Sequence, residues 1–213
     1  MPTKTVLITR PDHEPVTKYL CLWSEEILTL TEHKGISIYD LRGKKASRKI
    51  FESFMSKHSP ALILLNGHGN AEIITGYDNE PIVDENSVMV GSIVYGRSCD
   101  AGQKLGDKLV NKGARTFIGY KRKFILAYTP DKMMKPLEDP IARLFLEPSN
   151  LVATSLIKGN TTLEAHRRSR EAMNKNFRRM LSSVASFEER HAAPWLWSNL
   201  NSQVLIGDQT AFF

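Results

Sequence analysis

Along the first 120 residues, short apolar runs alternate with segments of helical spacing, and this alternation limits the chain to few folds. The runs are rich in Val, Ile and Leu, and they predict strands at residues 4–9, 36–41, 61–65, 92–95 and 115–120. Apolar residues recur at helical spacing between them, over residues 16–33, 44–57 and 101–111. Continuous apolar strands that alternate with helices are typical of a mainly parallel sheet covered on both faces.

The sequence therefore predicts an α/β fold, a three-layer sandwich with a mostly parallel central sheet of about six strands. We expect a single domain over residues 1–213, in which residues 1–120 form the core sheet. Residues 121–213 are expected to form a C-terminal helical part, with a long amphipathic helix over 161–182 and a last strand at 203–206. The segment between the third and fourth strands has the pattern of a small hairpin or loop insertion.

The charge balance and the hydropathy pattern argue against two classes of partner, nucleic acids and membranes. The net charge is +6, from 29 basic and 23 acidic residues, and the densest basic stretch (residues 166–179) lacks the interleaved aromatic side chains of a nucleic-acid platform. A solvated helix face is the better interpretation of that stretch. No apolar run approaches the ~18 residues of a membrane span, and the N-terminal apolar stretch is too short for a signal peptide. We predict a cytoplasmic protein that binds no membrane.

Two of the predicted strands end in small-residue turns that each carry one reactive side chain. The strand at 61–65 leads into Asn66-Gly67-His68-Gly69, and the strand at 92–95 leads to Cys99. Adjacent parallel strands present such turns at the same edge of the sheet, where α/β folds place their chemistry. An imidazole close to a thiol can accept its proton, and the resulting thiolate is a strong nucleophile. The pattern predicts Cys99 as nucleophile and His68 as general base.

The surroundings of the two residues favour the same chemistry. The backbone amides of Gly69 and Cys99 are candidates for an oxyanion hole. The helix expected from residue 101 would favour a thiolate at Cys99 through its N-terminal dipole, and flanking glycines would let a peptide backbone approach closely. Asn66 is a candidate to hydrogen-bond the imidazole or its loop, although a turn residue that satisfies local amides is the simpler alternative.

Other motifs give no competing chemistry. Cys21 lies in an apolar helical stretch and is interpreted as a core residue. There is no phosphate-binding glycine loop and no nucleophile-elbow motif. A zinc site at His68 and Cys99 would need further ligands that the spacing does not supply. The predicted reaction needs neither a metal nor another cofactor.

At these two strand ends the sequence resembles the caspase-like cysteine peptidases, the group that includes caspases, legumain, gingipains and the CHAT domains. Residues 62–69 (LILLNGHG) match the apolar strand followed by His-Gly, and residues 93–102 (IVYGRSCDAG) resemble the small-Cys-acid-x-Gly pattern. The following helix and strand, over residues 102–120, are similar to CHAT and gingipain sequences, and so is the end of the chain near Trp197 and residues 205–208. The resemblance implies a thiol protease that cleaves a protein or peptide substrate through a Cys99 acyl-enzyme.

The residue two positions before the nucleophile departs from the relatives that cut after basic residues. In this family that position often borders the first substrate pocket, and here it is Arg97. A guanidinium there would bind a carboxylate and repel a basic side chain, which favours Asp or Glu before the scissile bond. Alternatively, Arg97 faces solvent or pairs with Asp100, itself a candidate substrate contact. A basic preference would instead require an acid in the pocket, with candidates Asp12, Asp78, Asp84 and Asp100.

Two other functions stay open on the sequence. One is a non-catalytic, CHAT-like interaction module that works with a regulatory protein partner. The other is a basic α/β domain that binds nucleic acid. The presence of both His68 and Cys99 favours the enzyme over the module, and the lack of mixed basic and aromatic patches disfavours nucleic acid.

Overall fold

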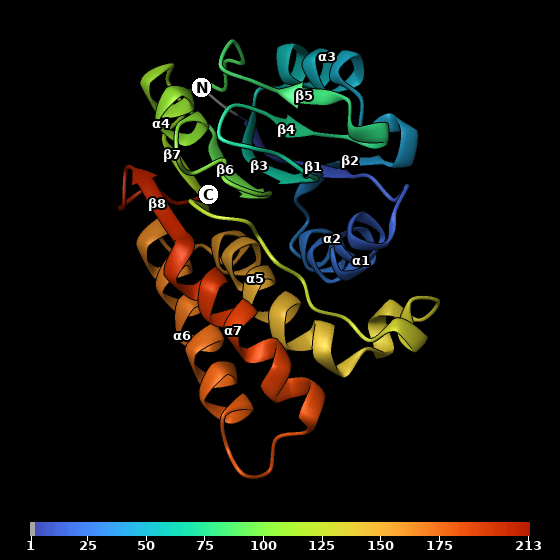
Figure 1. Ribbon diagram of the computed structural model, residues 1–213. Helices are drawn as coiled ribbons and strands as arrows, with labels where there is room; N and C mark the ends of the chain where they lie inside the picture. The colour runs from blue at the N-terminus through green and yellow to red at the C-terminus, as the bar shows by residue number, and fades with distance from the viewer. Residues whose placement is uncertain (1–2) are drawn as a thin grey trace.

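The computed structural model describes residues 3–213, and its core is a six-stranded sheet with helices on both faces (Figure 1). The strands follow the spatial order β2-β1-β3-β6-β7-β8. All neighbours are parallel except β8, which runs antiparallel to β7 at one edge. The strands of this sheet are β1 (Thr3–Arg10), β2 (Ser37–Arg42), β3 (Pro60–Asn66), β6 (Ile93–Arg97), β7 (Thr116–Tyr120) and β8 (Gln203–Gly207). The predicted three-layer α/β sandwich is therefore confirmed.

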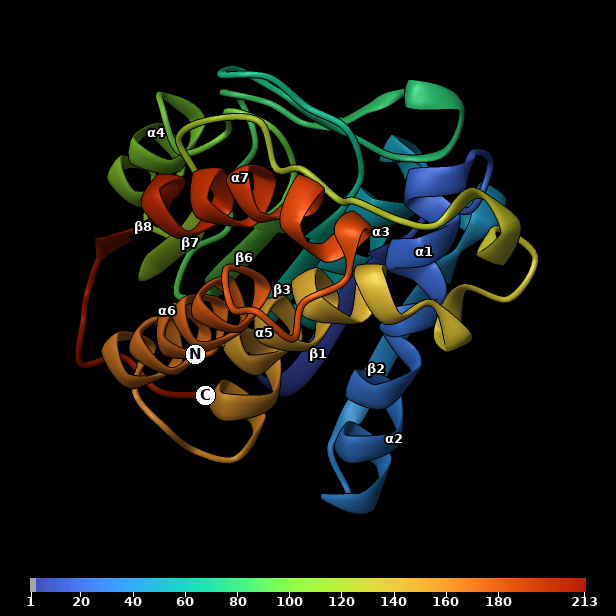
Figure 2. The same cartoon turned by 60° about the horizontal axis from the view of Figure 1, so that its bottom comes forward.

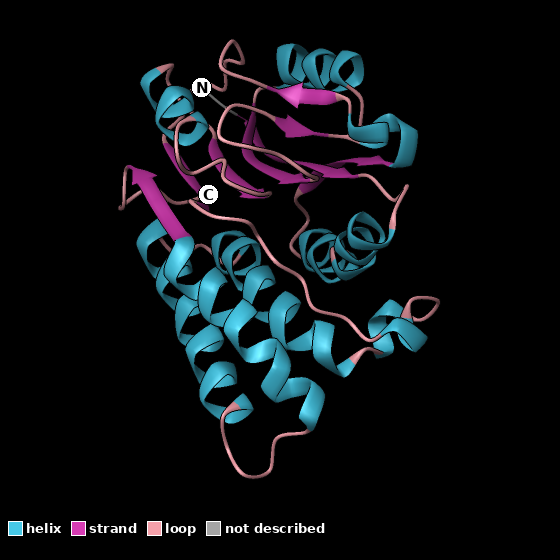
Figure 3. Cartoon of the chain, viewed as in Figure 1, coloured by secondary structure: helices cyan, strands magenta, loops and turns pink. Residues whose placement is uncertain are grey.

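Helices form two unequal layers around this sheet (Figure 3). One face packs against α3, α4 and a two-stranded hairpin, and the other face packs against α1, α2 and the C-terminal helices. The helices are α1 (Pro15–Trp23), α2 (Glu25–His33), α3 (Arg48–His58), α4 (Leu105–Asn111), α5 (Pro140–Ile157), α6 (Thr162–Met180) and α7 (Phe187–Ser202). Short 3₁₀ turns lie at η1 (Gly43–Lys45), η2 (Tyr77–Asn79), η3 (Pro130–Lys132) and η4 (Pro136–Glu138).

Alternate residues of each central strand enter the two cores, which explains why the strands read as continuous apolar runs. In β1, Val6 and Ile8 pack toward the C-terminal helices, whereas Leu7 packs toward α3. The insertion after β3 forms the antiparallel pair β4 (Ile74–Thr75) and β5 (Pro81–Val83), as predicted. Within the described residues, no helix is long and apolar enough to cross a membrane.

Two predicted helices differ from the structure. The helix expected over 16–33 is broken at Ser24 into α1 and α2, and the buried Ser24 hydroxyl donates to the carbonyl of Leu20 at 2.7 Å. The helix expected from residue 101 begins only at Leu105. Asp100 has a left-handed backbone (φ 59°) and its amide donates to the carbonyl of Arg122, so a turn precedes the helix.

Candidate active site

The ends of β3 and β6 bring the two predicted catalytic loops together. These strands are parallel neighbours, and Asn66 pairs with Arg97 as the last pair of their register. His68 and Cys99 each lie two residues beyond that pair, so they leave the sheet at the same edge. The loops are in contact, because a Cβ atom on Gly69 would lie 3.2 Å from the Cβ of Ser98.

The two glycines beside His68 are required by the packing of their own loop. A Cβ on Gly67 would lie 2.0 Å from the carbonyl oxygen of Thr75, and one on Gly69 would lie 2.6 Å from that of Ile73. Any side chain would push the loop away from β4. The reason expected from the sequence, close approach of a substrate backbone, is therefore not needed to explain these glycines.

Glu14 joins the site, although the sequence did not single it out. It precedes α1, and its Oε1 lies 2.8 Å from Nε2 of His68 and 3.2 Å from Nε2 of His13. The His68 side chain is 39% exposed, so the ring is open to solvent on one side while Glu14 faces Nε2. A carboxylate against Nε2 orients the ring and stabilises an imidazolium. Nδ1 is then the ring nitrogen left to act on a thiol.

Buried polar atoms without hydrogen bonds are concentrated at this edge of the sheet. Six buried side-chain nitrogen or oxygen atoms of the described residues have no hydrogen-bond partner, and five of them belong to His13, Glu14, His68 and Ser98. Glu14 is within ion-pair distance of both rings, but these contacts lack hydrogen-bond geometry. Unsatisfied groups of this kind are rare in folded proteins and mark places where a ligand or water completes the structure.

Cys99 is a resting thiol. It is half-buried, and its Sγ donates to the carbonyl oxygen of Phe124 at 3.8 Å. Within the described residues it makes no hydrogen bond to His68. Burial raises the pKa of the thiol, while the nearby Phe124 peptide and Lys123 oppose that rise only in part. The expected help from a helix dipole is wrong, because α4 starts six residues after Cys99.

The two amides predicted as an oxyanion hole are available. Neither the N–H of Gly69 nor that of Cys99 donates to another described residue. The next amide in the His68 loop is used, since Asn70 donates to the carbonyl of Ile73, and the amide of Thr75 on β4 donates to the carbonyl of His68. Free amides on two touching loops are suited to bind a developing negative charge.

Arg97 and Asn66 lie beneath the edge, inside the protein. The Arg97 side chain is only 2% exposed, and its nitrogens donate to Asn66 Oδ1, Asn150 Oδ1 and Ser24 Oγ, each at 2.7 Å. Asn66 in turn donates from Nδ2 to the carbonyl of Thr9 at 2.7 Å. Burial lowers the pKa of the Arg97 guanidinium, which has no carboxylate as a hydrogen-bond partner.

This arrangement changes how Arg97 and Asn66 are understood. Arg97 neither faces solvent nor pairs with Asp100, which are the alternatives expected from the sequence, and Asn66 bonds Arg97 instead of His68. Asp100 accepts from the side-chain amide of Gln103 at 2.9 Å. An acidic substrate preference set by Arg97 stays a prediction, and it requires Asn150 or Ser24 to give up its place on the guanidinium.

The remaining candidate residues are placed elsewhere or carry other bonds. Cys21 is buried, and burial raises the pKa of its thiol, as befits a core residue. Asp84 pairs with Arg48 at 2.7 Å. Among residues 3–213, no group of three or more His, Cys, Asp or Glu side chains is arranged to hold a metal ion.

Comparison with known proteins gives no family assignment. No protein-family model matches the chain, and no curated protein matches it. The resemblance to caspase-like peptidases therefore stays a prediction that rests on the two motifs and on the geometry of their loops.

Replacing Glu14 tests whether its carboxylate orients His68. We expect Glu14→Gln to lower kcat for peptide cleavage about tenfold with KM unchanged, because one charge-assisted contact is worth about 1.5 kcal/mol. The melting temperature should change little, since the pair is half-exposed. Glu72→Gln is the matched control, because Glu72 lies beside the same loop and pairs only with the exposed Lys104. Equal losses in both variants would contradict the assignment.

The resting thiol can be tested by alkylation. In a Cys21→Ala background, the rate of Cys99 modification by iodoacetamide should rise with pH, because only the thiolate reacts. The raised pKa places the midpoint above the ~8.5 of free cysteine, so alkylation at pH 7 should be slower than that of N-acetylcysteine. A midpoint near neutrality would instead indicate a preformed thiolate–imidazolium pair.

The buried guanidinium should contribute strongly to stability. Arg97→Met leaves the Oδ1 atoms of Asn66 and Asn150 without a donor and removes one of the donors to Ser24 Oγ, so we expect the free energy of unfolding to fall by about 2–4 kcal/mol. Urea denaturation measures this change. Arg143→Met is the control, because Arg143 is 53% exposed and its partner Glu147 lies 3.7 Å away, and it should change stability by less than about 0.5 kcal/mol.

Proposed function

We propose that this protein is a cysteine endopeptidase of the caspase-like type, with Cys99 as nucleophile and His68 as general base. The observation that carries the proposal is the arrangement of residues at the edge of the sheet where β3 and β6 end. Two touching loops at the ends of adjacent parallel strands hold a thiol and an imidazole, together with buried polar atoms that make no hydrogen bond within the described residues. Such an arrangement is costly for folding and is expected where a substrate binds.

The proposed reaction uses only residues of this edge. Nδ1 of His68 takes the Cys99 proton, and Glu14 at Nε2 stabilises the charged ring. The thiolate sulfur bonds to the substrate carbonyl carbon, and the carbonyl electron pair moves onto oxygen, where the amides of Gly69 and Cys99 bind it. Collapse breaks the C–N bond, and the amine leaves with the proton from His68. A water molecule that gives a proton to His68 then attacks the thioester carbon, the C–S bond breaks, and the Cys99 sulfur leaves and takes the proton back from His68 as the carboxylic acid product is released.

The same site also supports a second candidate, a non-catalytic CHAT-like interaction module. The observation that favours it is the resting thiol, which is bonded to the Phe124 carbonyl and has a raised pKa. In the peptidase, substrate or a regulatory protein partner must break that bond and bring Cys99 to His68. If the protein is an interaction module, the hydrogen bond between Cys99 and the Phe124 carbonyl persists when the partner binds.

The cellular environment that we propose follows from the chemistry of the two thiols. Two free cysteines and a protonated nucleophile suit a reducing, cytoplasmic environment. The reaction needs a protein or peptide substrate, and it requires no cofactor. On α6, Arg167 and Arg168 both pair with Glu164, and the basic stretch lacks interleaved aromatic side chains, so nucleic acid is not the proposed partner.

Nucleophile replacement separates the two candidates. A peptide library should be cleaved by the wild type, lost in Cys99→Ala and retained in Cys21→Ala, with liquid chromatography and mass spectrometry as the readout. A peptidyl electrophile should label the wild type at Cys99, and His68→Ala should slow labelling by about a hundredfold or more, which is typical of a general base. If neither cleavage nor peptide-dependent labelling occurs with folded wild type, the interaction module is the better assignment.

A further inference from the structure

An extended segment next to Cys99 leaves part of its backbone unpaired. After β7 the chain runs as an extended loop alongside α7 (Figure 2), and the carbonyl of Phe124 in this loop accepts from the Cys99 thiol. Among the described residues, the amides and carbonyls of residues 126–128 find no hydrogen-bond partner. Backbone groups of a half-buried segment are rarely left without a partner.

The two ends of this segment are held firmly. Asn199 on α7 binds both backbone groups of Ile125, since its Nδ2 donates to the carbonyl at 2.7 Å and its Oδ1 accepts from the amide at 2.9 Å. At the other end, the amide of Thr129 donates to Asp139 Oδ2 at 2.7 Å. A fixed, extended backbone with free donors and acceptors is the template on which a peptide adds as a strand.

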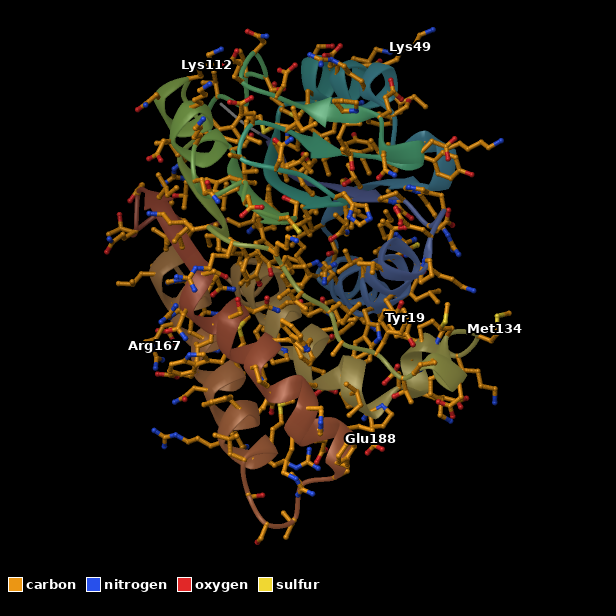
Figure 4. All side chains as sticks on the ribbon, viewed as in Figure 1. Tyr19, Lys49, Lys112, Met134, Arg167 and Glu188 are labelled. Carbon is orange, nitrogen blue, oxygen red and sulfur yellow. The ribbon has the colours of Figure 1, made fainter. Side chains whose placement is uncertain are left out.

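A groove of about 360 Å³ lies along the same segment, on the side of α7. Its walls include Tyr128 from the segment and Phe187, His191 and Trp195 from the helix. Phe187 is 64% exposed and Trp195 is 50% exposed, so large aromatic surfaces line an open hollow. Glu188 stands at the rim, at the start of α7 (Figure 4). Exposed aromatic surface in a hollow is typical of a site that binds an apolar side chain.

The stretch of chain between Phe124, whose carbonyl binds the Cys99 thiol, and the groove corresponds to a few peptide residues. The groove is lined by residues 127–130, which are three to six positions along the extended chain from Phe124. At ~3.3 Å per residue this is about 10–20 Å. A peptide that pairs with residues 126–128 while its scissile bond lies at Cys99 would reach the groove with a side chain three to six residues from that bond.

We infer that this groove is a specificity subsite for a bulky apolar side chain, aromatic or branched aliphatic, of an extended peptide paired with residues 126–128. The register of the inference rests on the proposed peptidase function, whereas the groove and the free backbone do not. The lining combines the aromatic rings of Tyr128, Phe187 and Trp195 with one imidazole and one carboxylate, which suits an apolar group better than a charged one.

The experiment measures peptide binding and cleavage separately. Binding of a fluorescent positional-scanning library is measured with Cys99→Ala protein, with and without Trp195→Ala, and cleavage is measured with Cys99 present. We expect peptides with Phe, Trp or Leu at one position three to six residues from the bond to bind at least tenfold more weakly to the Trp195→Ala protein. Peptides with Ser at that position should bind both proteins equally weakly.

Trp197→Ala is the matched control, because Trp197 lies on the same helix, is 48% exposed and lines a different groove with Arg167. Arg167 lies on the opposite side of the helical part from Glu188 (Figure 4). Phe187→Ala is a second test of the same groove. Phe187 is more exposed than Trp195, so its replacement is less able to disturb folding, and a folding defect in Trp195→Ala alone would not decide the result. Melting temperatures of all variants are compared with the wild type.

The outcomes separate this inference from the proposed function. Cleavage without any apolar preference, or a preference that survives both Trp195→Ala and Phe187→Ala, overturns the subsite while the peptidase stands. Absence of both cleavage and peptide-dependent labelling, together with Trp195-dependent binding of apolar peptides, supports the subsite and overturns the peptidase. Self-association of the protein that is lost in Trp195→Ala would assign the groove to a second copy and overturn the inference.

Discussion

The pairing of β3 with β6, and the cation that lies beneath its last pair, fix the geometry on which the site depends. Arg97 and Asn66 end the register and also bond each other. The same guanidinium reaches Ser24 between α1 and α2 and Asn150 on α5, so one side chain ties the strand ends to two separate helices. A buried charge is tolerated only when its donors are satisfied. The strand ends are therefore held rigidly, and the loops that carry His68 and Cys99 start from fixed positions.

The loops at the edge of the sheet differ from the Arg97 network, because several of their polar groups make no hydrogen bond within the described residues. Within the described residues, His13, Glu14, His68 and Ser98 hold buried polar atoms that make no hydrogen bond, and the nearby amides of Gly69 and Cys99 donate none. The thiol meanwhile rests on the carbonyl of Phe124, which belongs to the segment with the unpaired backbone. A peptide that paired with this segment would lie beside the hydrogen bond between the Cys99 thiol and the Phe124 carbonyl. Substrate binding and release of the thiol are thus physically linked in the proposed peptidase.

The sequence predicts the sheet well because buried parallel strands need apolar side chains on both faces, and this demand is visible locally. Prediction from the sequence fails where a residue far along the chain determines the local structure. The break at Ser24 has no strong sequence signal, yet its hydroxyl serves as acceptor for Arg97. The same limit explains the site: His68 and Cys99 stand out because each follows a strand, whereas Glu14 reaches His68 only through the fold.

The C-terminal part of the chain carries none of the motifs, yet it completes the site. β8 pairs with β7 at the sheet edge, and α7 precedes it directly, so the strand pairing fixes where the helix lies. Asn199 on that helix then holds Ile125, and Phe187 and Trp195 form one wall of the groove. In the proposed peptidase the reacting atoms would belong to residues 68 and 99, which the two motifs identify. The inferred preference for an apolar side chain would come from surfaces that have no fixed spacing to those residues. The proposed chemistry and the inferred selectivity would therefore be encoded in different halves of the sequence, and they would meet along the extended segment that follows β7.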